Sequence, residues 1–436
     1  MTREFKLRFS GAYSELPVTD KSLLLERGAT RDATVSDRVA VIVDRVRTTG
    51  DTALREMASE FDGVDLGELE VGRASLVDAL EQLPQDLRQS MERSANNIRR
   101  FHEGQLPKAS SIIIEPGVTI GRRPDALGRV GVYAPGGRAS YPSSVLMGAI
   151  PAKVAGVGEI VLCSPPSEGG FPSQAVLAAA QLSGVDRVFA VGGAGAIAAM
   201  CLGTTTIPRV DKVVGPGNAY VAEAKLQLAT IASFDSPAGP SELLVIADDK
   251  ANPESVAREV LAQAEHDPQA VAIVIATDQN TARRIGSEIS IQMKTAIRGD
   301  IIATSLAERG GVVSVGSIAD ALAISNAFAP EHLMLAVSNP RQALELVRNA
   351  GTVFLGEASS VAFGDYMTGA NHVLPTGGLA RSYSGLSTLD FVRWTTFQEI
   401  TPSGAASLAR DVAVFAEAEG LSAHAAASLA WARVPS

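Results

Sequence analysis

Two segments of the chain repeat one pattern, a buried strand followed by a helix and a second buried strand. The first runs from EIVLCSPP at residues 159–166, through SQAVLAAAQLSG, to DRVFAVGG at residues 186–193. The second runs from SELLVIADD at residues 241–249, through NPESVAREVLAQAEHD, to AVAIVIATD at residues 270–278. Strands that alternate with helices are typical of largely parallel sheets. The sequence therefore predicts an α/β protein with two Rossmann-like parallel-sheet domains.

The rest of the chain divides around these two units. Apolar and charged residues alternate at helical spacing before residue 110, and a domain boundary is indicated near residues 128–133. A long glycine-rich loop follows Gly356, and the final segment predicts two helices separated at Gly420. We expect a helical N-terminal arm of residues 1–28, a first Rossmann-like domain of residues 29–130 plus 241–385, a second of residues 131–240, and a small helical C-terminal element of residues 386–436.

The charge balance narrows the class of partner. The chain has 48 acidic and 38 basic residues, a formal charge of −10 and no evident basic cluster, which disfavours nucleic-acid binding. The N-terminus lacks the apolar run of a secretory signal, and the uncharged residues 188–208 are too rich in glycine and threonine for a membrane span. We expect a cytoplasmic protein that does not bind membranes, in which Cys163 and Cys201 are buried thiols.

Polar residues in the C-terminal half could carry chemistry. Gln263 and His266 stand three residues apart near the end of a predicted helix, so both side chains can face one atom. Both side chains are suitable zinc ligands, although the same spacing also occurs by chance. Glu331 and His332 precede a predicted strand and could serve acid–base chemistry. They converge only if they lie in the turn, and the alternative is a histidine packed at a strand end.

Two further pairs lie nearer the C-terminus. Asp365 and His372 stand in the glycine-rich loop, where polar residues between glycines commonly line sites. Glu419 and His424 flank the break between the last two helices, where charged residues are more often solvated. Each pair taken alone is therefore ambiguous.

A glycine-rich turn follows the strand at VFAV. The run from Gly193 through Gly195 to Ala198 matches the G-x-G-x-x-A dinucleotide pattern, with Asp211 about 20 residues further on. Such turns also serve close packing, so the pattern only suggests a nucleotide.

Together these features make the chain similar to the histidinol dehydrogenase family over nearly its whole length. The motifs that carry the resemblance follow the family's order and are RVGVYAPGGRASYPSSVLMGAIPAKVAGV, VDKVVGPGNAYVAEAK, DSPAGPSELLVIAD, LAQAEHDP, FAPEHL, FGDYMTGANHVLPT and EGLSAH. The candidate pairs, each ambiguous alone, support one another within this resemblance.

The resemblance implies a site that uses zinc, one ion per subunit, and NAD. The implied zinc ligands are Gln263, His266, Asp365 and His424. The implied catalytic pair is Glu331 and His332. The implied substrate contacts are Ser241, Gln263, His266, His332, Asp365, Glu419 and His424. The implied NAD contacts are Tyr133 and Asn218, and the position of Gly195.

Gly195 departs from the family pattern. The family usually has GGAQAIAA here, with the glutamine in contact with NAD, whereas this chain has GGAGAIAA. A glycine cannot supply the hydrogen bond of an amide side chain, so NAD affinity or binding mode should differ at this position.

The implied reaction is the last step of histidine biosynthesis, the oxidation of L-histidinol through L-histidinal to L-histidine with two NAD. His332 would take the hydroxyl proton, for which an unperturbed pKa near 6.5 is suitable, and Glu331 would activate the water that hydrates the aldehyde. Zinc would hold the imidazole and amine of the substrate. A rival for the second step is Cys163 or Cys201 as a nucleophile that forms a thiohemiacetal.

The resemblance also implies a homodimer. The C-terminal element would be exchanged between subunits, so that Glu419 and His424 serve the neighbour's site, with the catalytic and metal residues in the first domain and NAD on the second. Two other functions stay open, a paralogue that oxidises another small alcohol such as a sulfonated diol, and a zinc hydrolase in which Glu331 activates water. A purely structural role would leave the ordered motifs unexplained.

Overall fold

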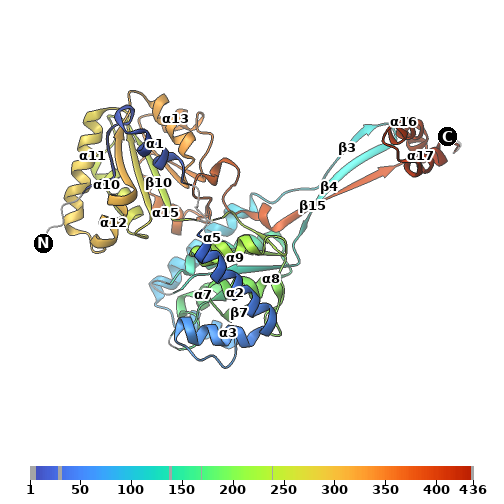
Figure 1. Ribbon diagram of the computed structural model, residues 1–436, viewed down its shortest axis with the longest axis horizontal. Coiled ribbons are helices and arrows are strands. Elements are labelled where there is room, and N and C mark those ends of the chain that lie inside the picture. The colour runs from blue at the N-terminus through green and yellow to red at the C-terminus, as the bar shows by residue number, and fades with distance from the viewer. Residues whose placement is uncertain (1–5, 28–31, 137–139, 168, 238, 434–436) are drawn as a thin grey trace.

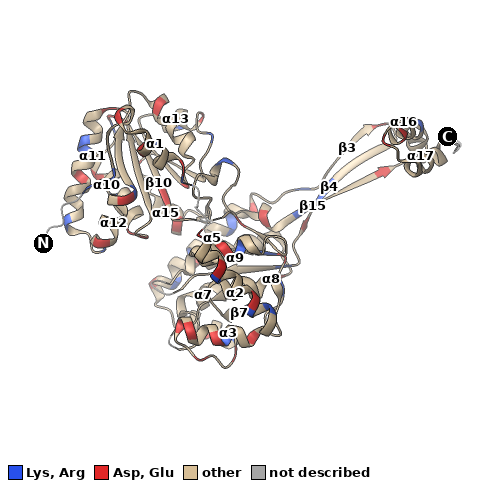
Figure 2. Ribbon diagram, viewed as in Figure 1, with Lys and Arg blue, Asp and Glu red and all other residues tan. Residues whose placement is uncertain are grey.

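The computed structural model describes residues 6–27, 32–136, 140–167, 169–237 and 239–433. They form two α/β domains that lie side by side and a long arm that extends away from both, with the C-terminal helices at its tip (Figure 1). Acidic and basic residues are interspersed over both domains in this view (Figure 2). Among the described residues, no helix combines the length and apolar character needed to cross a bilayer.

The first domain is built on a six-stranded sheet in which every strand is parallel to its neighbours. In spatial order the strands are β1 (Phe9–Ala12), β12 (Gly310–Ser314), β11 (Val271–Ala276), β10 (Glu242–Ala247), β13 (His332–Ala336) and β14 (Thr352–Leu355). Leu243 and Val245 of β10 face one core and Leu244 and Ile246 face the other, since successive side chains of a strand point to opposite faces.

Helices cover both faces of this first sheet, as a doubly wound fold requires. The helices on the Leu243 side are α10 (Pro253–Ala264), α11 (Gln279–Gln292), α12 (Gly299–Arg309) and α15 (Val361–Tyr366). Those on the Leu244 side are α1 (Val18–Leu25), α13 (Ile318–Phe328) and α14 (Pro340–Leu344). The second predicted strand–helix–strand unit is therefore β10, α10 and β11.

The second domain is built on another six-stranded sheet, parallel except for one short edge strand. Its strands, in spatial order, are β2 (Glu70–Val71), β7 (Arg187–Ala190), β6 (Glu159–Ser164), β5 (Arg129–Tyr133), β8 (Lys212–Val214) and β9 (Ser233–Phe234). One face is covered by α4 (Arg73–Glu81), α5 (Gln85–Glu103), α6 (Pro142–Ala155) and α7 (Gln174–Ser183). The other face is covered by α2 (Ala33–Thr49), α3 (Asp51–Met57), α8 (Gly193–Leu202) and α9 (Ala219–Gln227). The first predicted unit is therefore β6, α7 and β7.

The division of the chain between the two sheets differs from the expected one. Residues 33–103 were assigned to the first domain, but their helices pack on the second sheet, where Val39 and Leu76 enter its two cores. The expected N-terminal arm instead supplies β1 and α1 to the first domain. Helical periodicity shows which face of a helix is buried but not which sheet buries it, so these limits could not be read from the pattern.

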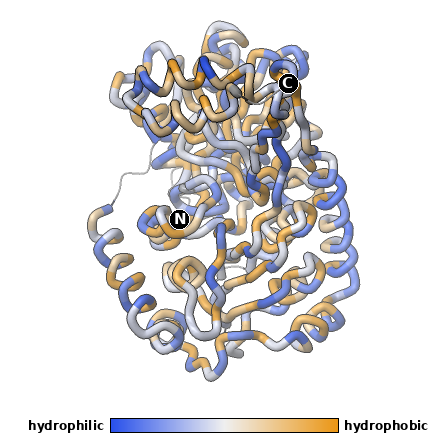
Figure 3. Tube along the Cα trace, turned by 90° about the vertical axis from the view of Figure 1, so that its right-hand side faces the viewer, coloured by the Kyte–Doolittle hydropathy of each residue, from blue (hydrophilic) through white to orange (hydrophobic). Residues whose placement is uncertain are grey.

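The arm is a three-stranded antiparallel sheet that carries two helices. Its strands are β3 (Ser110–Glu115), β4 (Val118–Ala126) and β15 (Val392–Ile400), and its helices are α16 (Pro402–Ala418) and α17 (Ser422–Leu429). The C-terminal element is therefore not purely helical as expected, because β15 pairs with β4 over nine residues. Viewed toward the tip of the arm, hydrophobic positions run along both helices (Figure 3), and Phe415 is 71% exposed.

Candidate active site

The predicted acid–base pair lies where α13 gives way to β13. The helix ends at Phe328, and Ala329 follows in the left-handed region with φ 52° and ψ 66°. Glu331 therefore lies in the turn and His332 is the first residue of the strand. The two side chains converge, with His332 Nδ1 3.4 Å from Glu331 Oε2, which meets the geometric condition set by the sequence.

Glu331 is buried and held by a short chain of hydrogen bonds. Its Oε2 accepts from Ser241 Oγ at 2.8 Å and from the backbone N–H of Glu242 at 2.7 Å. Gln263 Nε2 in turn donates to Ser241 Oγ at 2.9 Å. Three residues predicted separately, Ser241, Gln263 and Glu331, thus form one network across β10, α10 and the turn before β13.

His332 is buried beside two carboxylates. Its Nδ1–H donates to the backbone oxygen of Glu242 at 3.0 Å, so Nε2, 3.7 Å from Asp365 Oδ1, is the nitrogen that can take a proton. Burial lowers the pKa of His332, but attraction from Glu331 and Asp365 outweighs it and raises the pKa to about 9. The unperturbed pKa assumed from sequence is therefore wrong for this geometry. A cation bound by Asp365 would remove part of the charge that raises this pKa.

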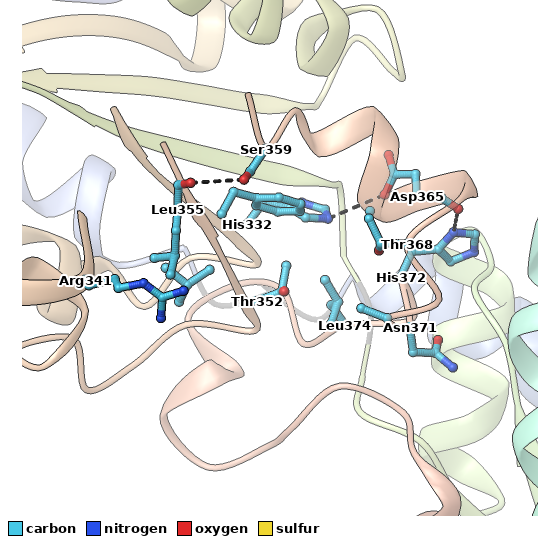
Figure 4. Close-up of a pocket in the computed structure, with 14 residues that line it drawn as sticks. His332, Arg341, Thr352, Leu355, Ser359, Asp365, Thr368, Asn371, His372 and Leu374 are labelled. Atoms are coloured by element: carbon cyan, nitrogen blue, oxygen red, sulfur yellow. Dashed lines mark hydrogen bonds and ion pairs between the residues drawn. The ribbon is translucent and has the colours of Figure 1, made fainter. Parts of the chain in front are cut away.

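A pocket opens beside His332 along the edge strand β14 (Figure 4). Its volume is about 430 Å³, and His332, Asp365 and His372 line it. Asp365 lies in α15, so the segment expected to be a long loop after Gly356 is partly helical. His372 Nδ1–H donates to the backbone oxygen of Asp365 at 2.8 Å, and burial lowers the pKa of His372. His372, which is not among the implied ligands or catalytic residues, thus supports the segment that carries Asp365.

Helix α10 begins as its sequence predicts and ends at the metal-ligand motif. The side chain of Asn252 caps the helix by accepting from Glu254 N–H, and Pro253 is its first residue. Gln263 in the last turn is buried, whereas His266 lies beyond the end of the helix and is exposed. Within the described part of the chain, no hydrogen bond or ion pair joins the His266 ring to another predicted ligand.

The remaining predicted site residues of the C-terminal element are not near the pocket. Glu419 directly follows α16 and His424 lies in α17, both exposed at the tip of the arm, far from α13 and α15 of the first domain (Figure 1). Within the described residues, no group of three His, Cys, Asp or Glu side chains is arranged to hold a metal ion. One copy of the chain therefore does not assemble the predicted four-ligand set.

The predicted cofactor residues lie in the second domain. Tyr133 ends β5 in the core, where its hydroxyl accepts from Gly193 N–H at 3.0 Å and where burial raises its pKa to about 12. Asn218 caps α9 by accepting from the N–H groups of Tyr220 and Val221. Tyr133 and the glycine-rich turn are therefore in contact at the carboxyl end of the strand, where ligands bind in open α/β sheets.

Two parts of the dinucleotide pattern do not fit. Asp211 accepts from the backbone N–H of Arg129, at the amino end of β5, so it lies at the opposite edge of the sheet from Gly193. A Cβ on Gly195 would lie 3.1 Å from Met57 Sδ, so this position of α8 faces α3. The Rossmann-type ribose carboxylate inferred from spacing is thus wrong for Asp211, because spacing alone does not say which end of a strand a residue reaches.

The cysteines belong to the core of the second domain. Cys163 and Cys201 are both fully buried, and burial raises the pKa of Cys163 strongly and that of Cys201 to about 12. A thiolate nucleophile is therefore disfavoured at both positions.

Glu242 was not predicted as a residue of the site. Its only signal in the sequence is a charged residue at the start of an otherwise apolar strand.

Two largely parallel, helix-covered sheets and a buried carboxylate–imidazole pair beside a pocket define an α/β protein with a site suited to acid–base chemistry. Its fold is similar to that of an acetylating aldehyde dehydrogenase from Geobacillus thermoglucosidasius, with a TM-score of 0.50 and 12% identity over 87% of this chain and 93% of that one. At this identity the likeness concerns the fold alone.

Closer relatives identify the family. The sequence model described as Histidinol dehydrogenase matches residues 25–430. The histidinol dehydrogenases of Methanosarcina barkeri and Methanothermobacter thermautotrophicus are 44% and 45% identical over 94% and 93% of this chain and 95% of each relative. A crystal structure of histidinol dehydrogenase from Elizabethkingia anophelis has a TM-score of 0.94 and 36% identity over 99% of both chains. The chain belongs to the histidinol dehydrogenase family, whose members are NAD-dependent oxidoreductases.

Proposed function

We propose that this protein oxidises L-histidinol to L-histidine through L-histidinal with two NAD, as the last step of histidine biosynthesis in the cytoplasm. The observation that carries the proposal is the buried network in which Glu331 and His332 adjoin each other and Asp365 beside one pocket. A carboxylate and an imidazole in contact can exchange protons with a substrate alcohol and with water.

The residues of the site divide the chemistry between them. His332 Nε2 is the proposed base for the hydroxyl proton, since Nδ1 is committed to the Glu242 carbonyl. Glu331 is the proposed base for the water that adds to the aldehyde, and Ser241 and Gln263 orient its carboxylate. Ser241 and Glu419 are further proposed contacts of the substrate, and Tyr133, Asn218 and the backbone at Gly195 are proposed contacts of NAD. When bound, NAD accepts the hydride.

The donor set suits zinc. The proposed ligands offer carboxylate and amide oxygen with imidazole nitrogen, and they are Gln263, His266, Asp365 and His424. Two observations agree with a cation at this place, the buried Nε2 of His332, which lacks a hydrogen-bond partner among the described residues, and the Asp365 carboxylate that faces it. When bound, zinc would hold the imidazole and amine of histidinol in place as a Lewis acid.

We infer a homodimer in which His424 and Glu419 complete the neighbour's site. The inference is supported by the wide separation, within one chain, of α17 at the arm's tip from α15, which carries the pocket residue Asp365 (Figure 1). Apolar surface on the arm supports it too, because Ile113 of β3 and Phe415 of α16 are each 71% exposed, and exposed apolar patches mark association surfaces. The exposed surfaces of β3 and of α16 are therefore both accessible to a second copy of the chain.

The test is the number of NADH molecules formed per L-histidinol consumed by purified protein, with and without a chelator. We expect two NADH, lost on chelation and restored by zinc. Absence of NADH from well-folded, zinc-loaded protein would sink the proposal, and the same protein would then be assayed with a sulfonated diol and with amides in the absence of NAD. Those assays separate a paralogous alcohol dehydrogenase from a zinc hydrolase.

A further inference from the structure

The turn that carries the acid–base pair is held at the end of α13 by two arginines. Arg27 Nη2 donates to the Phe328 carbonyl at 2.5 Å, and Arg381 donates to the Ala327 carbonyl. Cations at a helix C-terminus satisfy its last carbonyls and interact favourably with its dipole. The next residue is Ala329, a non-glycine residue held at positive φ, and Glu331 and His332 follow it after one proline.

Arg27 is also part of a buried ion pair. Its Nη1 lies 2.8 Å from Glu242 Oε1, with the two side chains 7% and 3% exposed. The guanidinium lies 3.2 Å from the centre of the Phe328 ring, and Glu242 Oε1 also accepts from Gly377 N–H at 2.9 Å. A buried pair of this kind often gives little net stability compared with apolar residues, whereas it fixes geometry closely.

The backbone of Glu242 binds both members of the acid–base pair. Its N–H donates to Glu331 Oε2 at 2.7 Å, and its carbonyl accepts from His332 Nδ1 at 3.0 Å. The Glu242 side chain reaches Arg27, and Arg27 reaches the turn from the other side. Glu242 and Arg27 therefore enclose the turn between them.

Arg27, Glu242 and Gly377 also lie in segments where the chain passes between domains. Arg27 ends the segment that contains β1 and α1, and the next helix, α2, packs on the second sheet. Glu242 begins β10 directly after the return from β9. Gly377 lies in the stretch between α15 of the first domain and β15 of the arm. The buried Glu242 carboxylate thus connects three segments in which the chain passes between domains, and it does so next to the acid–base pair.

We propose that Arg27 and Glu242 are positioning residues that hold the turn of residues 328–332 and thereby aim the Glu331–His332 pair at its substrate. The inference rests on the proposed roles of Glu331 and His332. It assigns no proton transfer to Arg27 or Glu242 themselves. Removing the pair should loosen the turn and slow catalysis while substrate affinity changes little, since small misplacements of reacting groups cost rate steeply.

The test replaces the ion pair with two amides, Arg27→Gln with Glu242→Gln, which avoids an uncompensated buried charge. The matched control is Arg8→Gln with Asp20→Asn, which removes a more exposed pair, 2.7 Å long, in the same N-terminal segment. Arg27→Lys is a second variant that keeps the charge and loses the planar guanidinium, and it serves if the paired variant fails to fold.

Two readouts are taken on folded protein. Amide hydrogen exchange is followed at Ala329, Gly351 and Thr352, whose N–H groups bond to the carbonyls of Ser325, Pro330 and Glu331. We expect exchange at these amides to be at least about tenfold faster than in the wild type. We expect kcat to fall by about 10- to 100-fold, with KM for histidinol changed less than about threefold. The exchange rates and kcat of Arg27→Lys should lie between those of the wild type and of the paired variant. Those of the control should match the wild type.

Unchanged exchange and unchanged kcat in the folded paired variant, or in Arg27→Lys if only that variant folds, would overturn the inference. A lower unfolding midpoint with wild-type kcat and wild-type exchange would also overturn it, because it would make the pair merely structural. A wild type that forms no NADH would contradict the proposed function instead, and the exchange data would still decide whether the pair holds the turn.

Discussion

Glu331 accepts both of its hydrogen bonds through one oxygen, Oε2. No described residue hydrogen-bonds to the other oxygen, Oε1, so it can act on a water molecule. A buried carboxylate with one oxygen free of hydrogen bonds can still accept a proton there, whereas the hydrogen bonds to the other oxygen fix the orientation of the group. At the scale of single residues, the Glu331 side chain is thus held in place through Oε2 and free to act as a base through Oε1.

Replacing this carboxylate should separate the two oxidations. Glu331→Gln keeps an oxygen for Ser241 and the Glu242 N–H but is not a base, so we expect the aldehyde step to slow by about 10²- to 10⁴-fold. The yield of NADH per histidinol should fall from two toward one, with histidinal detected by mass spectrometry. Glu345→Gln, at an exposed position, is the control. Two NADH at the wild-type rate from Glu331→Gln would contradict this role.

Restoring the family's glutamine should not simply restore a cofactor contact. A Cβ at Gly195 would lie 3.1 Å from Met57 Sδ and 3.4 Å from Leu54 Cδ2. We expect Gly195→Gln to lower the free energy of unfolding by about 1–3 kcal/mol through overpacking, without lowering KM for NAD. Adding Met57→Ala should recover part of the lost stability. Chemical unfolding and NAD titration measure both effects, and tighter NAD binding by the single variant at wild-type stability would refute the expectation.

The contact between Glu331 and His332 could be predicted as a possibility because the two residues stand together in one short motif with a chemical meaning. The pKa of His332 could not be predicted, since it depends on burial, on the direction in which the Glu331 side chain points, and on Asp365 of α15. Arg27 and Glu242 could not be predicted as partners either, because they stand 215 positions apart in sequence and only the folded first domain brings them together.

At the scale of elements, the two strand–helix–strand units were predictable and the partners of the flanking helices were not. Strong caps and apolar runs fix a unit such as β10–α10–β11 locally. The choice of sheet for α2 or α5 depends on long-range packing that periodicity does not encode. Strand β15 was missed although its nine residues, VRWTTFQEI, are rich in β-branched and aromatic side chains, because it is mostly exposed and lacks the buried apolar run by which the other strands were predicted.

The arm depends on a glycine beneath an aromatic ring. Gly121 of β4 pairs with Phe397 of β15, and a Cβ at Gly121 would overlap the Phe397 ring. We therefore expect Gly121→Val to distort the arm, to weaken dimerisation by at least about tenfold and to reduce zinc content, with both domains still folded. Light scattering and metal analysis measure this. Gly72→Ala, where a Cβ meets no atom within 4 Å, is the control, and an intact zinc-loaded dimer of Gly121→Val would contradict the arm's role.

At the scale of the whole molecule, Glu331 follows α13 in the first domain, whereas α17, which carries His424, lies at the distant tip of the arm (Figure 1). A site shared between two copies makes a specific prediction for mixed subunits. His332→Ala, which removes the proposed base of the first oxidation, and His424→Ala should each leave the protein nearly inactive when tested alone. After joint unfolding and refolding, random pairing should restore about a quarter of the wild-type activity, because half of the dimers then carry one intact site. NADH formation measures the recovery, and no recovery from a mixture shown to contain heterodimers would mean that the site forms within one chain.

The pairing of β1 with β12 also sets an order in time. Phe9 lies beside Gly311 in the first sheet, whereas the second sheet is complete at Phe234. At a synthesis rate of 5–20 residues per second, the roughly 300 residues between the two strands take about 15–60 s to make. We therefore expect the second domain to fold on the ribosome first, while β1 stays unpaired until β12 of the first domain emerges.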